Sequence, residues 1–131
     1  MKSINFKLST YKVQMEINNG NPDPDDPEKD WSDWQEDTVV LAFDDIIFVP
    51  VINDMDKDYF EIRINDKRFS PDENSKLGLL YKGVLLTPDH VISFETETDG
   101  KKIKIKEDEV NIEIWGHKND ELRDVLYLTI T

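Results

Sequence analysis

The stretch VISFETETDGKKIKIK, residues 91–106, decides the fold class. Its apolar and polar residues alternate, which is typical of β-strands with one buried face. Asp99–Gly100 is a pair favoured in type I′ hairpin turns, because both central residues of that turn need a positive φ. A two-residue turn there places Glu95 opposite Lys104, so that opposite charges pair across the strands. The stretch therefore predicts an antiparallel hairpin.

The same register orders the other face of the hairpin and the strand that follows. It places Phe94 opposite Ile105, which pairs apolar side chains on the inner face. A second turn over 107–110 then places Lys104 opposite Glu113. Turn type, charge pairing and apolar pairing agree, so we expect these strands to form one meander.

Period-two alternation extends along most of the chain, and no stretch of ten residues has a clear helical pattern. The further strands that we expect cover residues 4–17, 38–43, 46–52, 59–64, 79–86 and 125–131. Within the first of these the phase slips at Ser9–Thr10, which predicts a bulge or bend in the strand. Pro50 has no N–H for a sheet ladder, so it predicts a bulge or an edge position.

These patterns predict one all-β domain over residues 1–131, with an acidic loop containing Pro and Trp at 18–37. With about eight or nine strands, an antiparallel β-sandwich is favoured, and a β-barrel is the alternative. A chain of 131 residues with 37% hydrophobic content is long enough to form a core.

The charge is strongly negative and unevenly distributed. The formal net charge is −13, and residues 21–37 contain eight acidic residues and one lysine, which gives −7 there. A negative surface repels phosphate backbones, so we expect no direct nucleic-acid binding. The same surface attracts a basic protein partner, although solubility alone also accounts for net charge.

Several functional classes find no support in the sequence. There are no cysteines, which excludes disulfides and thiolate sites. Neither the start MKSINFKLST nor any later stretch has a long apolar run, so we expect a cytoplasmic protein without a membrane segment. His90 and His117 lie in no recognisable catalytic motif, and we expect no enzyme.

The stretch NPDPDDPEKDWSDW, residues 21–34, is the candidate partner-binding segment. Asp30 can cap a short helical turn that begins at Trp31, which places Trp31 and Trp34 on one face. In one interpretation both tryptophans pack over the sandwich. In the other, one stays exposed inside an acidic rim, as in an interface hot spot. The candidate residues are Asp23, Asp25, Asp26, Asp30, Trp31, Asp33 and Trp34.

A calcium site is the alternative binding function. Asp54, Asp56 and Asp58 alternate in a short loop, and calcium-binding sandwiches such as C2 domains cluster aspartates in end loops. The EF-hand pattern fails, because Tyr59 and Asn65 occupy its glycine and glutamate positions. A simple turn explains the same residues, since Asp and Asn favour turn conformations. We expect no other cofactor.

Three segments resemble the competence protein J family, the inhibitors of a bacterial DNA-entry nuclease. They are STYKVQM (9–15), DWSDW (30–34) and VNIEIWGHKNDELRDVLYLTIT (110–131). The resemblance implies an inhibitor that binds a nuclease, and it assigns no individual site residue. Immunity proteins of bacterial toxin systems share the same profile, being small, acidic and free of cysteine.

The sequence therefore predicts a non-catalytic acidic protein of the nuclease-inhibitor or immunity type. Its partner would be a basic protein, such as a nuclease or a toxin. The alternatives are a calcium-binding sandwich module and a structural domain of unknown role.

Overall fold

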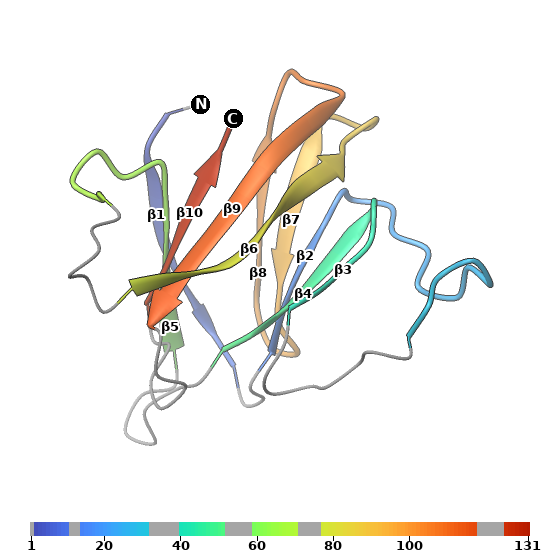
Figure 1. Ribbon diagram of the computed structural model, residues 1–131, viewed down its shortest axis with the longest axis horizontal. Helices are drawn as coiled ribbons and strands as arrows, with labels where there is room; N and C mark the ends of the chain where they lie inside the picture. Colours follow the sequence, from blue (N-terminus) through green and yellow to red (C-terminus); the bar gives the residue numbers. More distant parts are fainter. Residues whose placement is uncertain (1, 11–13, 32–39, 52–58, 71–76, 118–124) are drawn as a thin grey trace.

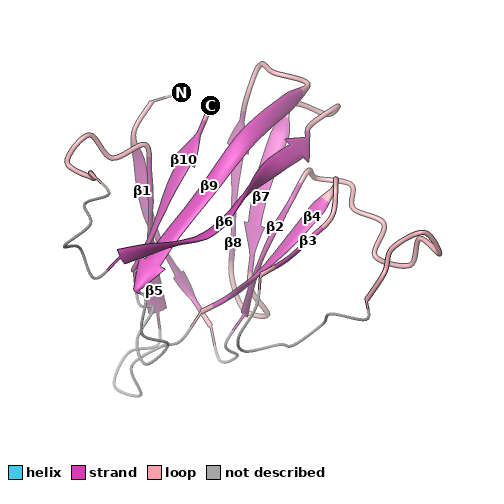
Figure 2. Ribbon diagram, in the orientation of Figure 1, coloured by secondary structure: helices cyan, strands magenta, loops and turns pink. Residues whose placement is uncertain are grey.

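A computed structural model describes residues 2–10, 14–31, 40–51, 59–70, 77–117 and 125–131. They form two five-stranded sheets (Figures 1 and 2). The first sheet has the order β1 (Ile4–Ser9), β5 (Tyr59–Ile64), β10 (Val125–Ile130), β9 (Glu109–His117) and β6 (Leu77–Leu86). The second has the order β3 (Leu41–Ala42), β4 (Ile46–Pro50), β2 (Gln14–Asn18), β7 (Val91–Glu95) and β8 (Gly100–Lys104).

The predicted β-sandwich is confirmed. Each sheet is open, with β1 and β6 at the edges of the first and β3 and β8 at the edges of the second, so the described strands do not close into a barrel. Every strand pairing among them is antiparallel except that of β5 with β10, which is parallel and which the sequence did not indicate. No helix of the described residues is long and apolar enough to cross a membrane.

The core lies between the sheets and is built from alternate residues of each strand. In β5, Phe60, Ile62 and Ile64 are fully buried while Glu61 and Arg63 face outward, as the alternation predicts. Each such buried side chain contributes roughly 1.5–3 kcal/mol of hydrophobic stabilisation. The largest core side chains from the other strands are Leu8, Met15, Ile17, Ile47, Leu85, Ile92, Phe94 and Ile112.

Of the bulge or bend predicted at Ser9–Thr10, the bulge is wrong, because β1 ends at Ser9 and the next described strand, β2, belongs to the other sheet. β1 pairs with β5 in the first sheet, whereas β2 pairs with β4 and β7 in the second. The change of phase in the apolar pattern therefore marks two strands rather than one. This split accounts for a strand count above the expected one.

The loop between β7 and β8 fixes this passage through hydrogen bonds. The Thr96 hydroxyl donates to the Ser9 carbonyl (2.6 Å), and the Ser9 N–H donates to Asp99 Oδ2 (3.1 Å). The Thr10 hydroxyl, on a buried residue, donates to Glu97 Oε1 (2.9 Å). Backbone groups that leave one ladder before joining the next are thereby satisfied by side chains.

These contacts explain why the predicted hairpin register is wrong. β7 and β8 do form a hairpin, but Glu95 lies opposite Gly100 and Phe94 opposite Lys101. Thr96 closes a longer loop, since its hydroxyl accepts the Asp99 N–H (3.0 Å). The register differs from the predicted one by an even number of residues, so Ile103 still faces the core.

The predicted meander through residues 107–110 is also wrong. β8 is an edge strand, and β9 lies in the other sheet, where Glu113 pairs with Lys82. The passage from β8 to β9 is bonded to the neighbouring passage from β6 to β7. Thr87, which is fully buried, donates from its hydroxyl to the Glu107 carbonyl (2.8 Å) and from its N–H to the Asp108 carbonyl (2.7 Å).

Replacing Thr96 with Val tests the role of the loop in fixing the passage between sheets. The variant keeps the shape of the side chain but loses the hydroxyl that serves Ser9 and Asp99. We expect the free energy of unfolding, measured by urea denaturation, to fall by about 1–3 kcal/mol. Thr129→Val, on the outer face of β10, is the matched control. An equal and small effect in both variants would contradict the assignment.

Candidate functional site

The acidic loop begins where β2 ends, and here the name refers to its described residues, 19–31. The Asn18 side chain accepts the Gly20 N–H (2.8 Å) and the Asn19 side chain accepts the Asn21 N–H (3.1 Å). Gly20 has a φ of 89°, and any side chain there would overlap Val91. The chain thus turns sharply out of the sheet, and the loop stands out beside β3 and β4 (Figure 1).

Two aspartates shape the loop through local turns. Asp23 Oδ1 accepts the Asp25 N–H (3.2 Å), and Asp26 Oδ1 accepts the Glu28 N–H (3.0 Å). Backbone hydrogen bonds from Asp26 to Asp23 (3.3 Å) and from Lys29 to Asp26 (3.1 Å) close the same two turns. Aspartate is favoured at such positions because its carboxylate can accept a nearby backbone N–H. Part of the acidity in this segment therefore has a structural role.

Lys29 anchors the loop to the turn between β3 and β4. Its ammonium donates to Asp45 Oδ2 (2.8 Å) and to the Asp23 carbonyl, and its side chain is only 8% exposed. Asp45 Oδ2 also accepts the Asp23 N–H (2.8 Å). One carboxylate on the sandwich therefore holds the loop at two points. The Lys29 ammonium also lies 5.7 Å from the centre of the Phe43 ring.

The ionisation of Asp45 follows from these contacts. Burial opposes its charged form, but the Asp23 N–H and the Lys29 ammonium outweigh burial and lower the pKa of Asp45 below its ordinary value of 3.8. Asp45 is therefore ionised at neutral pH. The loop anchor has its full strength under those conditions.

Trp31 holds the far end of the loop. Its ring lies 5.0 Å from that of Phe43 and 5.4 Å from that of Phe48, measured between centroids. Trp31 is half-buried, and both interpretations of this segment allow one tryptophan to pack over the sandwich. Trp34 and Asp33 lie outside the described residues, and so does the rest of the helical turn predicted from Asp30.

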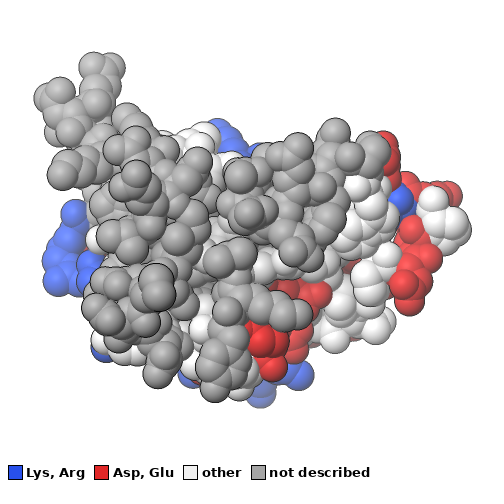
Figure 3. Space-filling view, turned by 90° about the horizontal axis from the view of Figure 1, so that it is seen from below, with Lys and Arg blue, Asp and Glu red and all other residues white. Residues whose placement is uncertain are grey.

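The remaining candidate residues line an acidic surface. Asp23, Asp25 and Asp30 are exposed, and Asp26 is half-buried. Figure 3 shows acidic side chains at the end of the molecule where the loop lies and again near the middle of its lower side, with basic side chains at the opposite end and along the lower side. A shallow groove of about 490 Å³ separates the loop from the β3–β4 turn; its lining includes Asp26, Glu28, Asp44 and Asp45.

The alternative calcium site stays a prediction. Asp54, Asp56 and Asp58 all lie outside the described residues. Among the residues that are described, no group of three or more His, Asp or Glu side chains is arranged to hold a metal ion.

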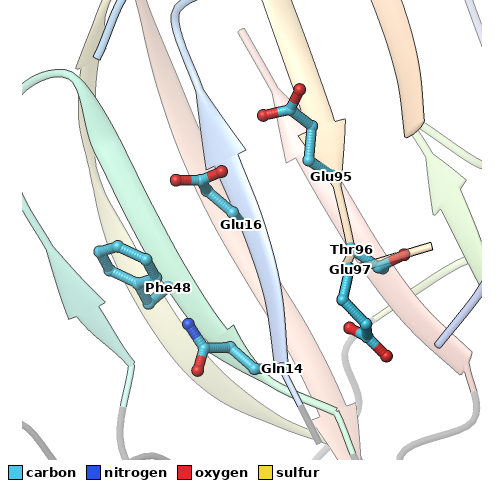
Figure 4. A pocket seen from close by; sticks show the side chains of 6 residues that line it. All are labelled: Gln14, Glu16, Phe48, Glu95, Thr96 and Glu97. Carbon is cyan, nitrogen blue, oxygen red and sulfur yellow. The ribbon is translucent and has the colours of Figure 1, made fainter. Parts of the chain in front are cut away.

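A pair of carboxylates that the sequence did not single out lies on the outer face of the second sheet. Glu16 of β2 is directly opposite Glu95 of β7, and the two line an open pocket of about 290 Å³ (Figure 4). Asn18 Nδ2 donates to Glu95 Oε2 (2.7 Å) and to Glu16 Oε2 (3.4 Å). Like charges placed directly opposite one another destabilise a sheet, so this pair needs an explanation.

The pair binds a proton near neutral pH. Burial, the hydrogen bond between the two carboxyl groups and the charge of Glu95 raise the pKa of Glu16 from 4.5 to about 7, although Asn18 acts in the opposite direction. The protonated form of Glu16 avoids the repulsion between two negative charges that face one another across the strands.

The pairing of β2 with β7 explains why the carboxylate pair could not be predicted from the sequence. The two strands are far apart in the chain, and in the predicted hairpin register Glu95 faces Lys104. Only the long-range register places Glu95 beside Glu16. A charged residue on the outer face of a strand does not indicate, from the nearby sequence alone, which residue lies opposite it on the neighbouring strand.

No protein-family model, curated protein or solved structure that was compared with this chain matches it. The resemblance to the competence protein J family therefore stays a prediction.

Replacing Asp45 with Ala tests the loop anchor. The variant leaves the Lys29 ammonium and the Asp23 N–H without their shared acceptor, so we expect the free energy of unfolding at pH 7 to fall by about 2 kcal/mol. The pKa of Asp45 is lowered in the folded state, so its stabilisation is present above about pH 4 and is lost as the pH falls through the folded pKa. The loss caused by the substitution should therefore shrink in acid.

Asp44→Ala is the matched control, because Asp44 is the exposed neighbour in the same turn. We expect its effect to stay within about 0.5 kcal/mol. Equal losses in the two variants, or a loss at Asp45 that does not depend on pH, would contradict the anchor.

Replacing Glu16 with Gln tests the carboxylate pair. Because the folded pKa of about 7 exceeds the ordinary value of 4.5, the folded state holds more protons between these values, and stability falls as the pH rises through that window. The variant should lose this slope and gain about 1 kcal/mol at pH 8, a figure reduced by solvent screening at a half-exposed site. Glu113→Gln is the control, and a slope that survives Glu16→Gln would refute the assignment.

Proposed function

We propose that this protein is a non-catalytic inhibitor or immunity-type protein that binds a basic protein through its acidic loop. The observation that carries the proposal is the anchoring of the loop. Lys29 and Trp31 hold it against the sandwich from one side, while Asp23, Asp25 and Asp30 stay exposed. The loop therefore presents its charge on a fixed frame.

A fixed acidic surface suits the binding of a basic protein for two physical reasons. Complementary charge raises the rate of encounter and sets the orientation of the partner. A loop that is already shaped by Asp23, Asp26 and three prolines loses less conformational entropy on binding than a flexible one. Both effects favour a specific complex.

A nuclease or a nucleic-acid-targeting toxin is the class of partner that fits this surface best. Such proteins carry basic surfaces that contact phosphates, and carboxylates can occupy the same positions. A net charge of −13 also keeps the inhibitor itself away from nucleic acid. The resemblance to the competence protein J family supports the same class, and a cytoplasmic location would suit the immunity role.

The first experiment is to recover the partner. The protein is immobilised and incubated at low salt with an extract of its source cells, and the bound proteins are identified. We expect a basic nuclease or toxin whose activity falls when the purified protein is added. Recovery of no basic protein, or of one whose activity is unchanged, would contradict the proposal.

A triple variant then tests the loop itself with the purified partner. Asp25→Asn, Asp26→Asn and Asp30→Asn remove three charges, while the amide introduced by Asp26→Asn still has an oxygen that can accept the Glu28 N–H. We expect the association rate to fall about tenfold at about 50 mM salt and much less at about 300 mM, because screening already weakens the attraction there. The folded state should be unaffected.

The matched control removes the same charge from the turns after β6 and β8 and from the first residue of β9. Asp89→Asn, Glu107→Gln and Glu109→Gln all alter exposed residues. The control should change the association rate much less than the loop variant does. Equal effects of the two triple variants would mean that total charge, rather than the acidic loop, guides the partner.

A further inference from the structure

β6 is a long edge strand, and one side of it has no strand partner among the described residues. It spans ten residues and pairs with β9 alone, and no described strand lies along its other edge (Figure 1). β8, an edge strand of the second sheet, is half as long as β6. Unpaired edges of this kind are templates for a strand from another chain.

The directions of the backbone groups along β6 follow from its two ends. The Thr87 N–H donates toward β9, to the Asp108 carbonyl, whereas the Leu86 N–H donates away from β9, to the Asp44 carbonyl (2.8 Å). The register with β9 is unbroken from Tyr81 to Leu86. Because these directions alternate along an antiparallel strand, the N–H and C=O groups of Lys82 and Val84 point to the open edge.

Three of the four exposed large hydrophobic residues in the described part of the chain lie on this strand. Leu79 is 47% exposed, Val84 42% and Leu86 41%, and Tyr59 is the one other large hydrophobic residue exposed to this extent. Monomeric proteins usually shorten, charge or cover such edges. Lys82 is the one exposed charge along this strand, and it pairs with Glu113 (3.6 Å).

One end of the edge is joined to the acidic side of the molecule. Asn19, the first residue of the acidic loop, donates from Nδ2 to the Leu86 carbonyl (3.1 Å), and Leu86 also bonds to Asp44. Burial raises the pKa of the Tyr81 phenol, and the negative charge of Asp44 raises it further. The open edge thus leads directly to Asp44 and the acidic loop.

We propose that the edge of β6 binds an extended segment of the basic partner as an added strand. The segment would alternate apolar residues that cover Leu79 and Val84, and would carry Lys or Arg at the end beside Asp44. Its backbone would pair with the open groups of Lys82 and Val84. This inference rests on the proposed function, and it names the part of the partner that the protein recognises.

Charge is what selects this occupant over a second copy of the chain. Two copies joined at β6 would bring together two molecules of charge −13, each with its own acidic loop near the junction. A basic segment would instead be attracted, because Asp44 and the acidic loop lie at one end of the edge to which it binds. Self-association is therefore an outcome that the test must distinguish.

Hydrogen exchange of individual backbone amides, read by NMR, tests the edge. In the free protein we expect the amides of Lys82 and Val84 to exchange faster than those of Tyr81, Gly83 and Leu85, by about tenfold or more. A synthetic peptide of about nine residues, with alternating Val and Thr and two Lys at one end, is then added as the partner segment. It should slow exchange at Lys82 and Val84 by about tenfold.

The matched peptide replaces its two Lys with Glu, and sedimentation reports the oligomeric state. Protection by the Lys peptide and not by the Glu peptide supports the proposal. Equal protection by both peptides, or by neither, overturns it. Slow exchange of Lys82 and Val84 in the free protein, accompanied by a dimer, would show that a second copy fills the edge and would equally overturn it.

Two variants extend the test to the purified partner. Val84→Pro removes an N–H that faces the open edge and not β9, so the sheet should persist, and we expect the complex to dissociate about tenfold faster. Val84→Thr keeps the N–H and the β-branched shape, and should dissociate at nearly the original rate. If Val84→Pro unfolds the protein, Val84→Lys tests the same edge with the backbone intact, because it removes the apolar contact and repels a basic segment, so the complex should again dissociate faster.

These outcomes separate the inference from the proposed function. A partner whose association depends on the acidic loop, but whose dissociation ignores changes at Val84, would end the inference and leave the function standing. If the protein recruits no basic partner, but the Lys peptide alone slows amide exchange at Lys82 and Val84, the proposed function is wrong and the edge of β6 remains a binding site.

Discussion

Where the described chain leaves one sheet for the other, backbone groups lose their ladder partners, and the structure depends on the side chains that bond them. The Thr96 hydroxyl donates to the Ser9 carbonyl at the end of β1. The hydroxyl of Thr87, which follows β6, donates to the Glu107 carbonyl just before β9. Asn19 does the same where the acidic loop leaves β2. An unpaired buried backbone group costs about as much as a lost hydrogen bond, so these polar residues set the paths that the apolar core alone leaves open.

In the acidic loop a side chain also bonds a backbone group, and here that side chain is the carboxylate of Asp45. Lys29 and the Asp23 N–H share one oxygen of Asp45, and Trp31 adds an apolar contact with Phe43. The negative charge that remains is exposed, which works against stability through repulsion but favours encounter with a cation-rich surface. The Glu16–Glu95 pair shows the same tension on another face, where the raised pKa of Glu16 reduces the repulsion near neutral pH.

The alternation of apolar and polar residues predicted those parts of the fold that depend only on which side chains are buried. The alternation of Phe60, Ile62 and Ile64 identifies their strand and its buried face, because burial acts on each side chain directly. The hairpin register was missed because Thr96 and Asp99 bond to Ser9, about ninety positions earlier in the chain. The acidic loop was found from composition, whereas its anchor at Asp45 depends on a contact between separate turns.

The proposed function requires that the acidic loop has its binding shape before any partner arrives. The most direct measurement is the ¹⁵N relaxation of the free protein, which gives an order parameter for each backbone amide. Residues 23–31 should have order parameters of about 0.85, equal to those of the strands, because Lys29 and Trp31 hold them. Values below about 0.6 over this segment would show a flexible loop and would contradict the account.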